Sequence, residues 1–159
     1  MKFNSALRNF VLVLFSTLLI SACSMTKKAS VDTVDDVYTG TDTVEYLAKG
    51  VPDRVFFATN KSKLTTRSRD TLRKQASWLR KNKDVTVTVE GQADERGTRE
   101  YNLALGERRA NAAKDYLMTY GISGKRVSVI SYGKEKPVNP ASSPLAWSQN
   151  RRSVTVKAN

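Results

Sequence analysis

A charged residue on an apolar helix face is the feature that most constrains how this chain can fold. Residues 99–120 have helical spacing, and their apolar stripe consists of Leu105, Ala112, Ala113, Tyr116 and Tyr120. Arg109 falls in the middle of this stripe. A guanidinium on a buried face is costly unless it is paired and hydrogen-bonded. The fold must therefore bring acceptors to Arg109, and the nearest acidic candidate is Asp94 on the preceding loop.

A guanidinium beside a carboxylate at the start of a helix has two uses. The two groups can form a buried salt bridge that closes the loop onto the helix. They can instead bind a zwitterionic ligand, whose ammonium faces Asp94 and whose carboxylate faces Arg109. The residues alone leave both interpretations open.

The N-terminus is typical of a bacterial export signal. Lys2 and Arg8 accompany an apolar run over residues 10–20, which is too short to span a bilayer comfortably. The run leads into the sequence LISAC, which ends at Cys23, the only cysteine of the chain. We therefore predict a lipoprotein signal peptide over residues 1–22 and lipidation of Cys23 after cleavage. The alternative is an ordinary signal peptide followed by an unrelated cysteine.

Residues 23–53 are predicted to be the lipidated N-terminus and a flexible tether. Their composition is rich in Ser, Thr, Asp and Val, has few aromatic residues and shows no clear period. A flexible coil of about 30 residues has a mean reach of roughly 30 Å. The tether would therefore hold a globular domain, residues 54–159, close to the membrane.

The globular domain alternates between strand and helix patterns. Strands are predicted at residues 54–58, 85–90, 126–132 and 152–157. Between them lie a helix from a cap at Thr65 or Thr66 to about residue 82, the long helix after Thr98, and one turn at residues 145–150. This order, β-α-β-α-β-(short α)-β, predicts a mixed α/β (α+β) fold in which two main helices pack on one face of a four-stranded mixed sheet.

Composition narrows the classes of function. The chain has 27 basic and 15 acidic residues, a net charge of +12, and no histidine. The surplus suggests anionic surroundings, although an evenly basic surface is the simpler interpretation, and the export signal argues against nucleic acid as a partner. Without histidine, and with Cys23 lipidated, no His-dependent triad and no soft metal ligand remain. We therefore predict no enzyme, no catalytic residues, no metal and no cofactor.

Three motifs carry a resemblance to a known family. Residues 89–112 have the sequence VEGQADERGTREYNLALGERRANA, residues 131–137 have SYGKEKP, and residues 150–152 have NRR. Over about residues 54–157 the chain resembles the OmpA-like peptidoglycan-binding domain of the peptidoglycan-associated lipoproteins. The resemblance implies a lipid-anchored protein of the outer membrane, with its domain in the periplasm. It also implies non-covalent binding of peptidoglycan through the diaminopimelate of the stem peptide.

The same resemblance implies which residues bind the cell wall. The family's key acid matches Asp94 and its key arginine matches Arg109, so that Asp94 would take the ammonium of diaminopimelate and Arg109 its carboxylate. Further binding residues are expected at Asn102, Leu105, Phe57 and Gln92. Alternatives stay open for two of them: Asn102 as a hydrogen bond at the helix start, and Phe57 as a core residue.

Two positions depart from the family pattern, and one pair has two interpretations. Gln92 stands where enterobacterial members usually have histidine, so it keeps a hydrogen bond but cannot titrate near neutral pH. Ala58 stands where an acid is frequent, so one acceptor for the ligand is missing. Arg151 and Arg152 either support a wall contact or form a solvated strand edge. We expect binding to survive with altered affinity.

The resemblance also implies a role in the Tol–Pal system, in envelope integrity and cell division. A rival function is that the chain chiefly docks a TolB-like periplasmic propeller protein, with wall binding secondary. A cell-wall hydrolase is disfavoured by the absence of histidine and of a plausible zinc ligand set.

Overall fold

The computed structural model of the chain describes residues 36–158. The predicted signal peptide, Cys23 and the first part of the predicted tether lie outside these residues. Across the described residues, none of the helices combines the length and apolar character needed to cross a bilayer.

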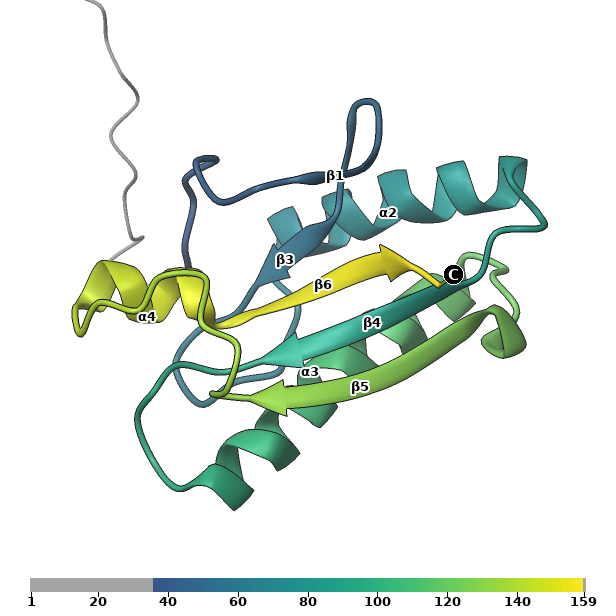
Figure 1. The fold of residues 1–159 in the computed structure, drawn as a ribbon. Coiled ribbons are helices and arrows are strands. Elements are labelled where there is room, and N and C mark those ends of the chain that lie inside the picture. The colour runs from purple at the N-terminus through teal and green to yellow at the C-terminus, as the bar shows by residue number, and fades with distance from the viewer. Residues whose placement is uncertain (1–35, 159) are drawn as a thin grey trace, which may run out of the picture.

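A four-stranded mixed sheet forms the centre of the fold (Figure 1). Its strands, in spatial order, are β3 (Arg54–Phe56), β6 (Arg152–Lys157), β4 (Val87–Gln92) and β5 (Val127–Gly133). Strands β4 and β5 are parallel, whereas β6 runs antiparallel to both β3 and β4. The carboxyl ends of β3 and β4 therefore meet the amino end of β6 at one edge of the sheet.

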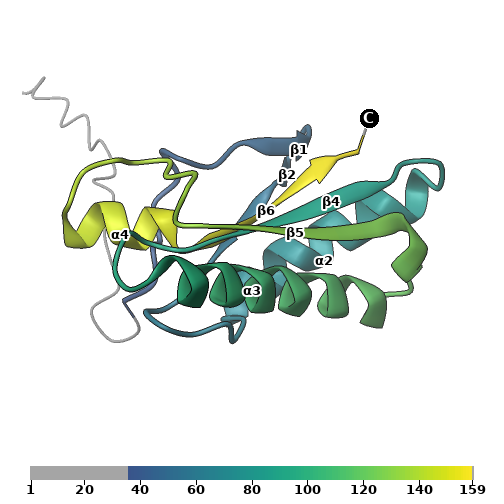
Figure 2. The same cartoon turned by 60° about the horizontal axis from the view of Figure 1, so that its bottom comes forward.

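Two long helices, α2 (Thr66–Lys81) and α3 (Arg99–Thr119), cover the same face of the sheet (Figures 1 and 2). Both begin where a threonine caps them: the Thr65 hydroxyl accepts from the Ser68 amide at 3.1 Å, and that of Thr98 from the Tyr101 amide at 3.2 Å. The short helices η1 (Gly124–Arg126) and α4 (Pro144–Asn150) precede β5 and β6. The predicted order of elements and the helices on one face are confirmed.

The core lies between the helices and the sheet. The alternating valines of β4 point inward, with Val87 and Val89 almost fully buried, and Leu72 and Leu79 of α2 are buried against them in the same cluster. Burying such side chains contributes roughly 1.5–3 kcal/mol each. The period-two pattern predicted from the sequence is thus the pattern of burial.

Helix α3 touches the sheet through its backbone. A Cβ placed on Gly91 of β4 would lie 1.8 Å from the carbonyl oxygen of Gly106 on α3, so only glycine allows this approach. The buried residues of α3 are centred on this contact: Asn102, Leu105, Gly106, Arg109, Ala110, Ala113 and Leu117. The predicted stripe was therefore slightly misplaced, because Ala112, Tyr116 and Tyr120 are only partly buried. Arg109, in contrast, is fully buried as predicted.

Residues 36–53 correct the expectation of a flexible coil for that part of the predicted tether. They form the antiparallel strands β1 (Tyr46–Ala48) and β2 (Val51–Pro52). Tyr38 is only 1% exposed, and its ring packs edge-on against Phe56 of β3 with centroids 4.8 Å apart. The apolar residues here are too few and too irregular to give a periodic pattern, so their burial depends on β3.

Candidate functional site

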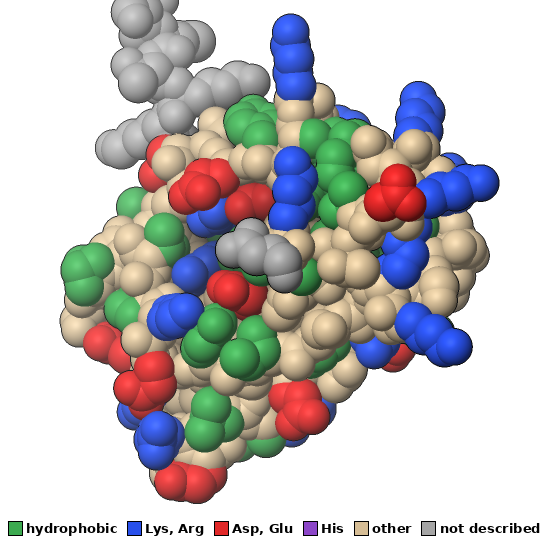
Figure 3. All heavy atoms as spheres, turned by 45° about the vertical axis from the view of Figure 1, so that its right-hand side comes forward, with side chains coloured by type: hydrophobic (Ala, Val, Ile, Leu, Met, Phe, Trp, Pro, Cys, Tyr) green, Lys and Arg blue, Asp and Glu red, His purple; other side chains and the backbone are tan. Residues whose placement is uncertain are grey.

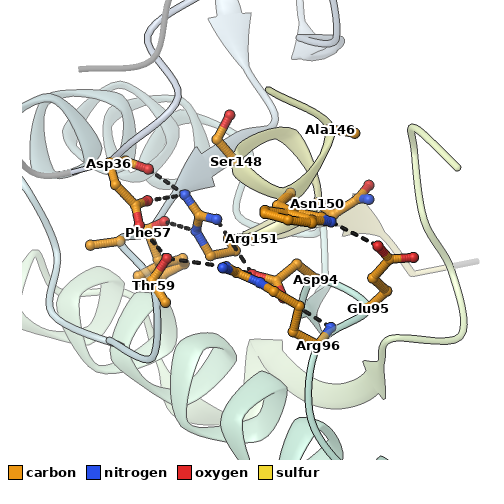
Figure 4. A network of polar contacts seen from close by, with 12 residues as sticks. Asp36, Phe57, Thr59, Asp94, Glu95, Arg96, Ala146, Ser148, Asn150 and Arg151 are labelled. Atoms are coloured by element: carbon orange, nitrogen blue, oxygen red, sulfur yellow. Dashed lines mark hydrogen bonds and ion pairs between the residues drawn. The ribbon is translucent and has the colours of Figure 1, made fainter. Parts of the chain in front are cut away.

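Buried and partly buried charged residues gather at the sheet edge where β3 and β4 end and β6 begins (Figure 4). The loop after β3 supplies Thr59, the loop after β4 supplies Asp94 and Arg96, and the junction of α4 and β6 supplies Arg151. Helix α3 adds Arg109, whose guanidinium donates to the carbonyl of Gln92, the last residue of β4.

The hydrogen bonds that Arg109 makes within residues 36–158 all go to backbone oxygens. Its guanidinium donates to the carbonyls of Lys61 at 2.9 Å, Gln92 at 2.8 Å and Ala58 at 3.1 Å, and lies 5.3 Å from the centre of the Phe57 ring. None of the ion pairs among residues 36–158 involves Arg109. Its burial, and then the nearby charge of Arg151, lower its pKa to about 10, so it remains a cation at neutral pH.

The acidic centre of the cluster is Asp94, which is 7% exposed. Arg96 donates to its two carboxylate oxygens at 3.0 Å and 2.7 Å, and Arg151 approaches at 3.4 Å. Burial would raise the pKa of Asp94, but the side-chain and backbone hydrogen bonds from Arg96 and the charges of Arg96 and Arg151 outweigh it. The pKa of Asp94 therefore falls below its ordinary value, and the group is anionic at neutral pH.

The predicted Asp94–Arg109 pair is not a direct contact. Asp94 pairs with Arg96 and Arg151 instead, and its charge reaches Arg109 only at longer range. The physical reason is that loop carbonyls fill the space around the Arg109 fork. A helical wheel places Arg109 on the buried face but contains no information about which backbone oxygens surround it.

Arg151, whose role the sequence left undecided, is a buried ionic partner of Asp94. Its side chain is 3% exposed, so the interpretation as a solvated strand edge was wrong. It donates to the Phe57 carbonyl at 3.1 Å and forms ion pairs with Asp94 and with Asp36, the first described residue (Figure 4). Arg96 and Thr59 were also missed: Arg96 lies inside the recognisable motif of residues 89–112, whereas no sequence signal marks Thr59.

The other predicted site residues lie around this cluster and are all buried. The Asn102 amide donates to the Arg96 carbonyl at 2.8 Å, which fastens the loop after β4 to the start of α3. Gln92 is 1% exposed and supplies one of the carbonyls on Arg109. Phe57 is 0% exposed and belongs to the main core cluster, and Leu105 is 3% exposed. Only Cys23 lies outside the described residues.

An aromatic side chain forms one rim of the cluster. The Arg96 guanidinium stacks over the Trp147 ring of α4 at 4.3 Å from its centre, and the indole N–H of Trp147 donates to Glu95 at 2.8 Å. On the other side a groove of about 740 Å³ opens between Asp36, Ala58, Lys61 and Arg69. The cluster is thus bordered by the Trp147 ring and by a groove that is large enough for an extended ligand.

Charge elsewhere on the molecule is spread out. On the face turned forward in Figure 3, basic side chains are scattered among acidic and apolar ones and do not form one patch. Within residues 36–158, His, Cys, Asp and Glu side chains nowhere gather in groups of three or more that could hold a metal ion. The arrangement of Asp94 beside Arg96, Arg109 and Arg151 is suited to binding a charged ligand.

Comparison with known proteins relates the chain to one family. A family model described as the OmpA family matches residues 56–151. A peptidoglycan-associated lipoprotein of Rhizobium meliloti is 55% identical over 106 residues, which are 67% of this chain and 60% of that protein. The match thus spans about 60% of that relative's length. A peptidoglycan-associated lipoprotein of Brucella melitensis is 41% identical over 150 residues, 91% of this chain and 89% of that protein.

Among the solved structures with a similar fold is another peptidoglycan-associated lipoprotein. The crystal structure of the peptidoglycan-associated lipoprotein from Burkholderia pseudomallei has a TM-score of 0.65 and 34% identity, and the match covers 67% of this chain and 90% of that one. The C-terminal domain of MotB from Helicobacter pylori has a TM-score of 0.63 at 22% identity, with 67% of this chain and 84% of that chain covered. The latter likeness shows the fold alone.

Proposed function

This chain belongs to the OmpA family and is related over nearly its whole length to peptidoglycan-associated lipoproteins, and from that premise we propose that it binds peptidoglycan without a covalent bond. The proposal includes a lipid anchor in the outer membrane and a domain in the periplasm that holds the cell wall. The protein is then a structural tether and not an enzyme.

One observation carries the proposal: an anionic Asp94 and a buried Arg109 without a carboxylate partner lie in the same cluster. A guanidinium has five N–H donors, and three of those of Arg109 are used by backbone carbonyls. Two N–H donors are therefore not used by these carbonyls, and because Arg109 is 0% exposed, a ligand carboxylate reaches them only when the surrounding loops move. The carboxylate of Asp94 suits the ammonium that sits on the same carbon of that ligand.

Diaminopimelate is the proposed ligand within the stem peptide. Its side chain ends in a carbon that bears both an ammonium and a carboxylate, which match Asp94 and Arg109 respectively. Lysine has the ammonium without this carboxylate. The site is therefore expected to favour diaminopimelate over lysine, because only the former uses the remaining donors of Arg109.

Co-sedimentation with purified sacculi tests the proposal. We expect the chain to pellet with sacculi that contain diaminopimelate, and free diaminopimelate to release it. Free lysine at the same concentration serves as the matched competitor and is expected to release much less. A chain that stays in the supernatant, or that lysine releases equally well, would exclude this ligand.

A lipid anchor at Cys23 is the second part of the proposal. Cys23→Ser is expected to yield a protein that leaves the membrane fraction, since the thiol that carries the lipid is absent. Several acyl chains give stable attachment, whereas one gives only marginal binding. Membrane fractionation and the mass of the mature N-terminus are the measurements. An unmodified Cys23 in the wild-type protein would rule out the anchor.

We also propose that the chain docks a TolB-like periplasmic propeller protein of the Tol–Pal system. Two apolar side chains near the site favour a protein partner: Leu145 of α4 and Val138, each 37% exposed. The Val138 amide donates to Asn150 at the end of α4, so the two segments are joined. A pull-down of the propeller protein with and without sacculi distinguishes the functions, because a shared surface makes the two partners compete.

A further inference from the structure

A carboxylate from the chain's own N-terminal segment lies in the cluster. Asp36 accepts from the Thr59 hydroxyl and forms an ion pair with Arg151, which also donates to the Asp36 backbone carbonyl (Figure 4). Thr59 in turn accepts from Arg96 at 3.2 Å. Asp36 thus contacts Arg151, which touches Asp94, and Thr59, which touches Arg96, although it precedes them in the chain by 115 and 23 positions.

The charges of the cluster explain why a carboxylate is held there. Arg96, Arg109 and Arg151 contribute three positive charges, and Asp94 contributes one negative charge. Asp36 supplies a second negative charge beside Arg151. Burial lowers the pKa of Arg151 below its ordinary value, and the carboxylates of Asp36 and Asp94 partly offset this effect. Without Asp36, Asp94 at 3.4 Å would be the one remaining ionic partner of Arg151 among the described residues. Any other carboxylate that reached Arg151 would replace this contribution.

The neighbouring residues hold Asp36 in place. Val37 and Tyr38 follow it directly, are 6% and 1% exposed, and pack with Phe56 in a small apolar cluster. Six residues after Asp36, the Asp42 carboxylate accepts from the Gln149 amide at 3.0 Å. Asp36 itself has a φ of +54°, in the left-handed region that aspartate tolerates better than most residues. These contacts fasten the segment on the C-terminal side of Asp36.

We propose that Asp36 is a built-in competitor of the cell-wall ligand. Its carboxylate occupies Arg151 and Thr59 in the absence of the wall, and it competes with a ligand carboxylate for the positive charge of the arginine cluster. The inference rests on the proposed binding of peptidoglycan at this site. It adds regulation: the affinity for the wall depends on the fraction of molecules in which Asp36 has left the cluster.

Asp36→Asn in the full chain tests this competition, because it removes the charge and keeps the size of the side chain. If the contact is formed in about 70–90% of free molecules, its loss is expected to tighten binding to sacculi by about three- to tenfold. Asp84→Asn is the matched control, since it makes the same charge change at an exposed residue before β4, at the opposite end of this strand from the cluster. The control is expected to bind within about twofold of wild type.

Three outcomes decide between the inferences. If wild type fails to bind sacculi, the proposed function itself is wrong. If wild type binds and Asp36→Asn binds equally or more weakly while its thermal melt is normal, Asp36 is not a competitor and only this inference is overturned. Equal tightening by Asp84→Asn would also overturn it, because the effect would then be one of net charge.

A second measurement covers the case in which Asp36→Asn does not fold. In the wild-type chain, the carboxyl carbon of Asp36 can be followed by nuclear magnetic resonance while free diaminopimelate is added. Displacement from Arg151 is expected to shift this signal at the concentrations that release the protein from sacculi. The signal of Asp42 should stay unchanged. A saturated site with an unshifted Asp36 signal would contradict the competition.

Discussion

Two buried arginines, one on strand β3 and one on helix α3, are satisfied in opposite ways. Arg54, the first residue of β3, makes two hydrogen bonds of 2.8 Å to Asp53 and lies 3.4 Å from Glu45. Burial would lower the pKa of Arg54, but the bonds to Asp53 and the charges of both acids raise it. Arg109 has only backbone carbonyls, and burial lowers its pKa to about 10. The first charge is neutralised within the fold, whereas the second is not.

A third buried arginine, Arg152, resembles Arg109 in bonding to backbone carbonyls. Burial, and then the charge of Arg54, lower the pKa of Arg152 to about 10 as well, and it donates to the carbonyls of Asn150 and Lys136. A buried guanidinium without a carboxylate is therefore not by itself a binding site. What distinguishes Arg109 is that two of the carbonyls it bonds to, those of Ala58 and Lys61, belong to residues that line a groove, and that the anionic Asp94 lies in the same cluster.

The largest expected effect separates Arg109 from Arg54. Arg109→Ala is expected to weaken sacculus binding more than tenfold, because the ligand carboxylate loses its guanidinium. It should also destabilise the domain by about 2–4 kcal/mol, since three carbonyls lose their donor. Arg54→Ala is expected to lower stability while leaving binding within about twofold of wild type. Co-sedimentation and thermal melts of both variants are the measurements.

Two outcomes would contradict this prediction. If folded Arg109→Ala binds sacculi like wild type, the site is assigned to the wrong residues, and Arg109 merely fastens the loop after β3. If Arg54→Ala loses binding to the same extent, the distinction between a neutralised and an unneutralised arginine has no functional meaning.

A smaller effect is expected on stability at Asp94. Asp94→Ala leaves the buried Arg151 with one carboxylate fewer, which costs about 3 kcal/mol or less because Arg96 is partly exposed. Since Asp94 touches Arg151 but not Arg109, the double mutant with Arg151→Ala should be less than additive, with a coupling of about 0.5–3 kcal/mol. The double mutant with Arg109→Ala should be closer to additive. Denaturant unfolding of the variants in the two mutant cycles is the measurement. A stronger coupling of Asp94 with Arg109 than with Arg151 would contradict the structure and support the direct pair expected from the sequence.

The smallest expected effect is that of pH. The pKa of Asp94 is lowered, so its stabilising contribution is complete above the ordinary carboxyl range near 3.9 and is lost only as the pH falls through its lower folded value. Arg109, with a pKa of about 10, stays protonated. Sacculus binding is therefore expected to be flat between about pH 5.5 and 7.5, in a chain without histidine.

Gln92→His supplies the comparison for this flat profile. It restores the residue type expected at this position from the family resemblance, and histidine titrates near pH 6.5. We expect a slope in binding between pH 5.5 and 7.5 for this variant alone, with titration effects of the sacculi removed by measuring both proteins on one preparation. A steep slope in the wild-type protein would mean that another group of the site titrates there.

Much of the fold was predictable because its signals are local. Alternating valines over residues 85–90, threonine caps before both long helices and Gly121 after the second one each depend on neighbours in the chain. Gly121 indeed has a φ of +82°, as a residue that follows a helix often does. These patterns determined the order of elements and the mixed fold. They also determined that Arg109 is buried, because helical spacing alone assigns it to the apolar face.

Tertiary structure decided what each buried charge touches. Lys61 and Ala58 in the loop after β3, and Gln92 at the end of β4, bring their carbonyls to Arg109 from 17 to 51 residues away in the chain. Asp36 reaches Arg151 across 115 positions, and Tyr38 finds its partner only in β3. Such contacts have no period in the sequence, since they depend on how strands order themselves in the sheet. The sequence by itself determined that an arginine had to be accommodated, and the packing of distant loops decided by which atoms.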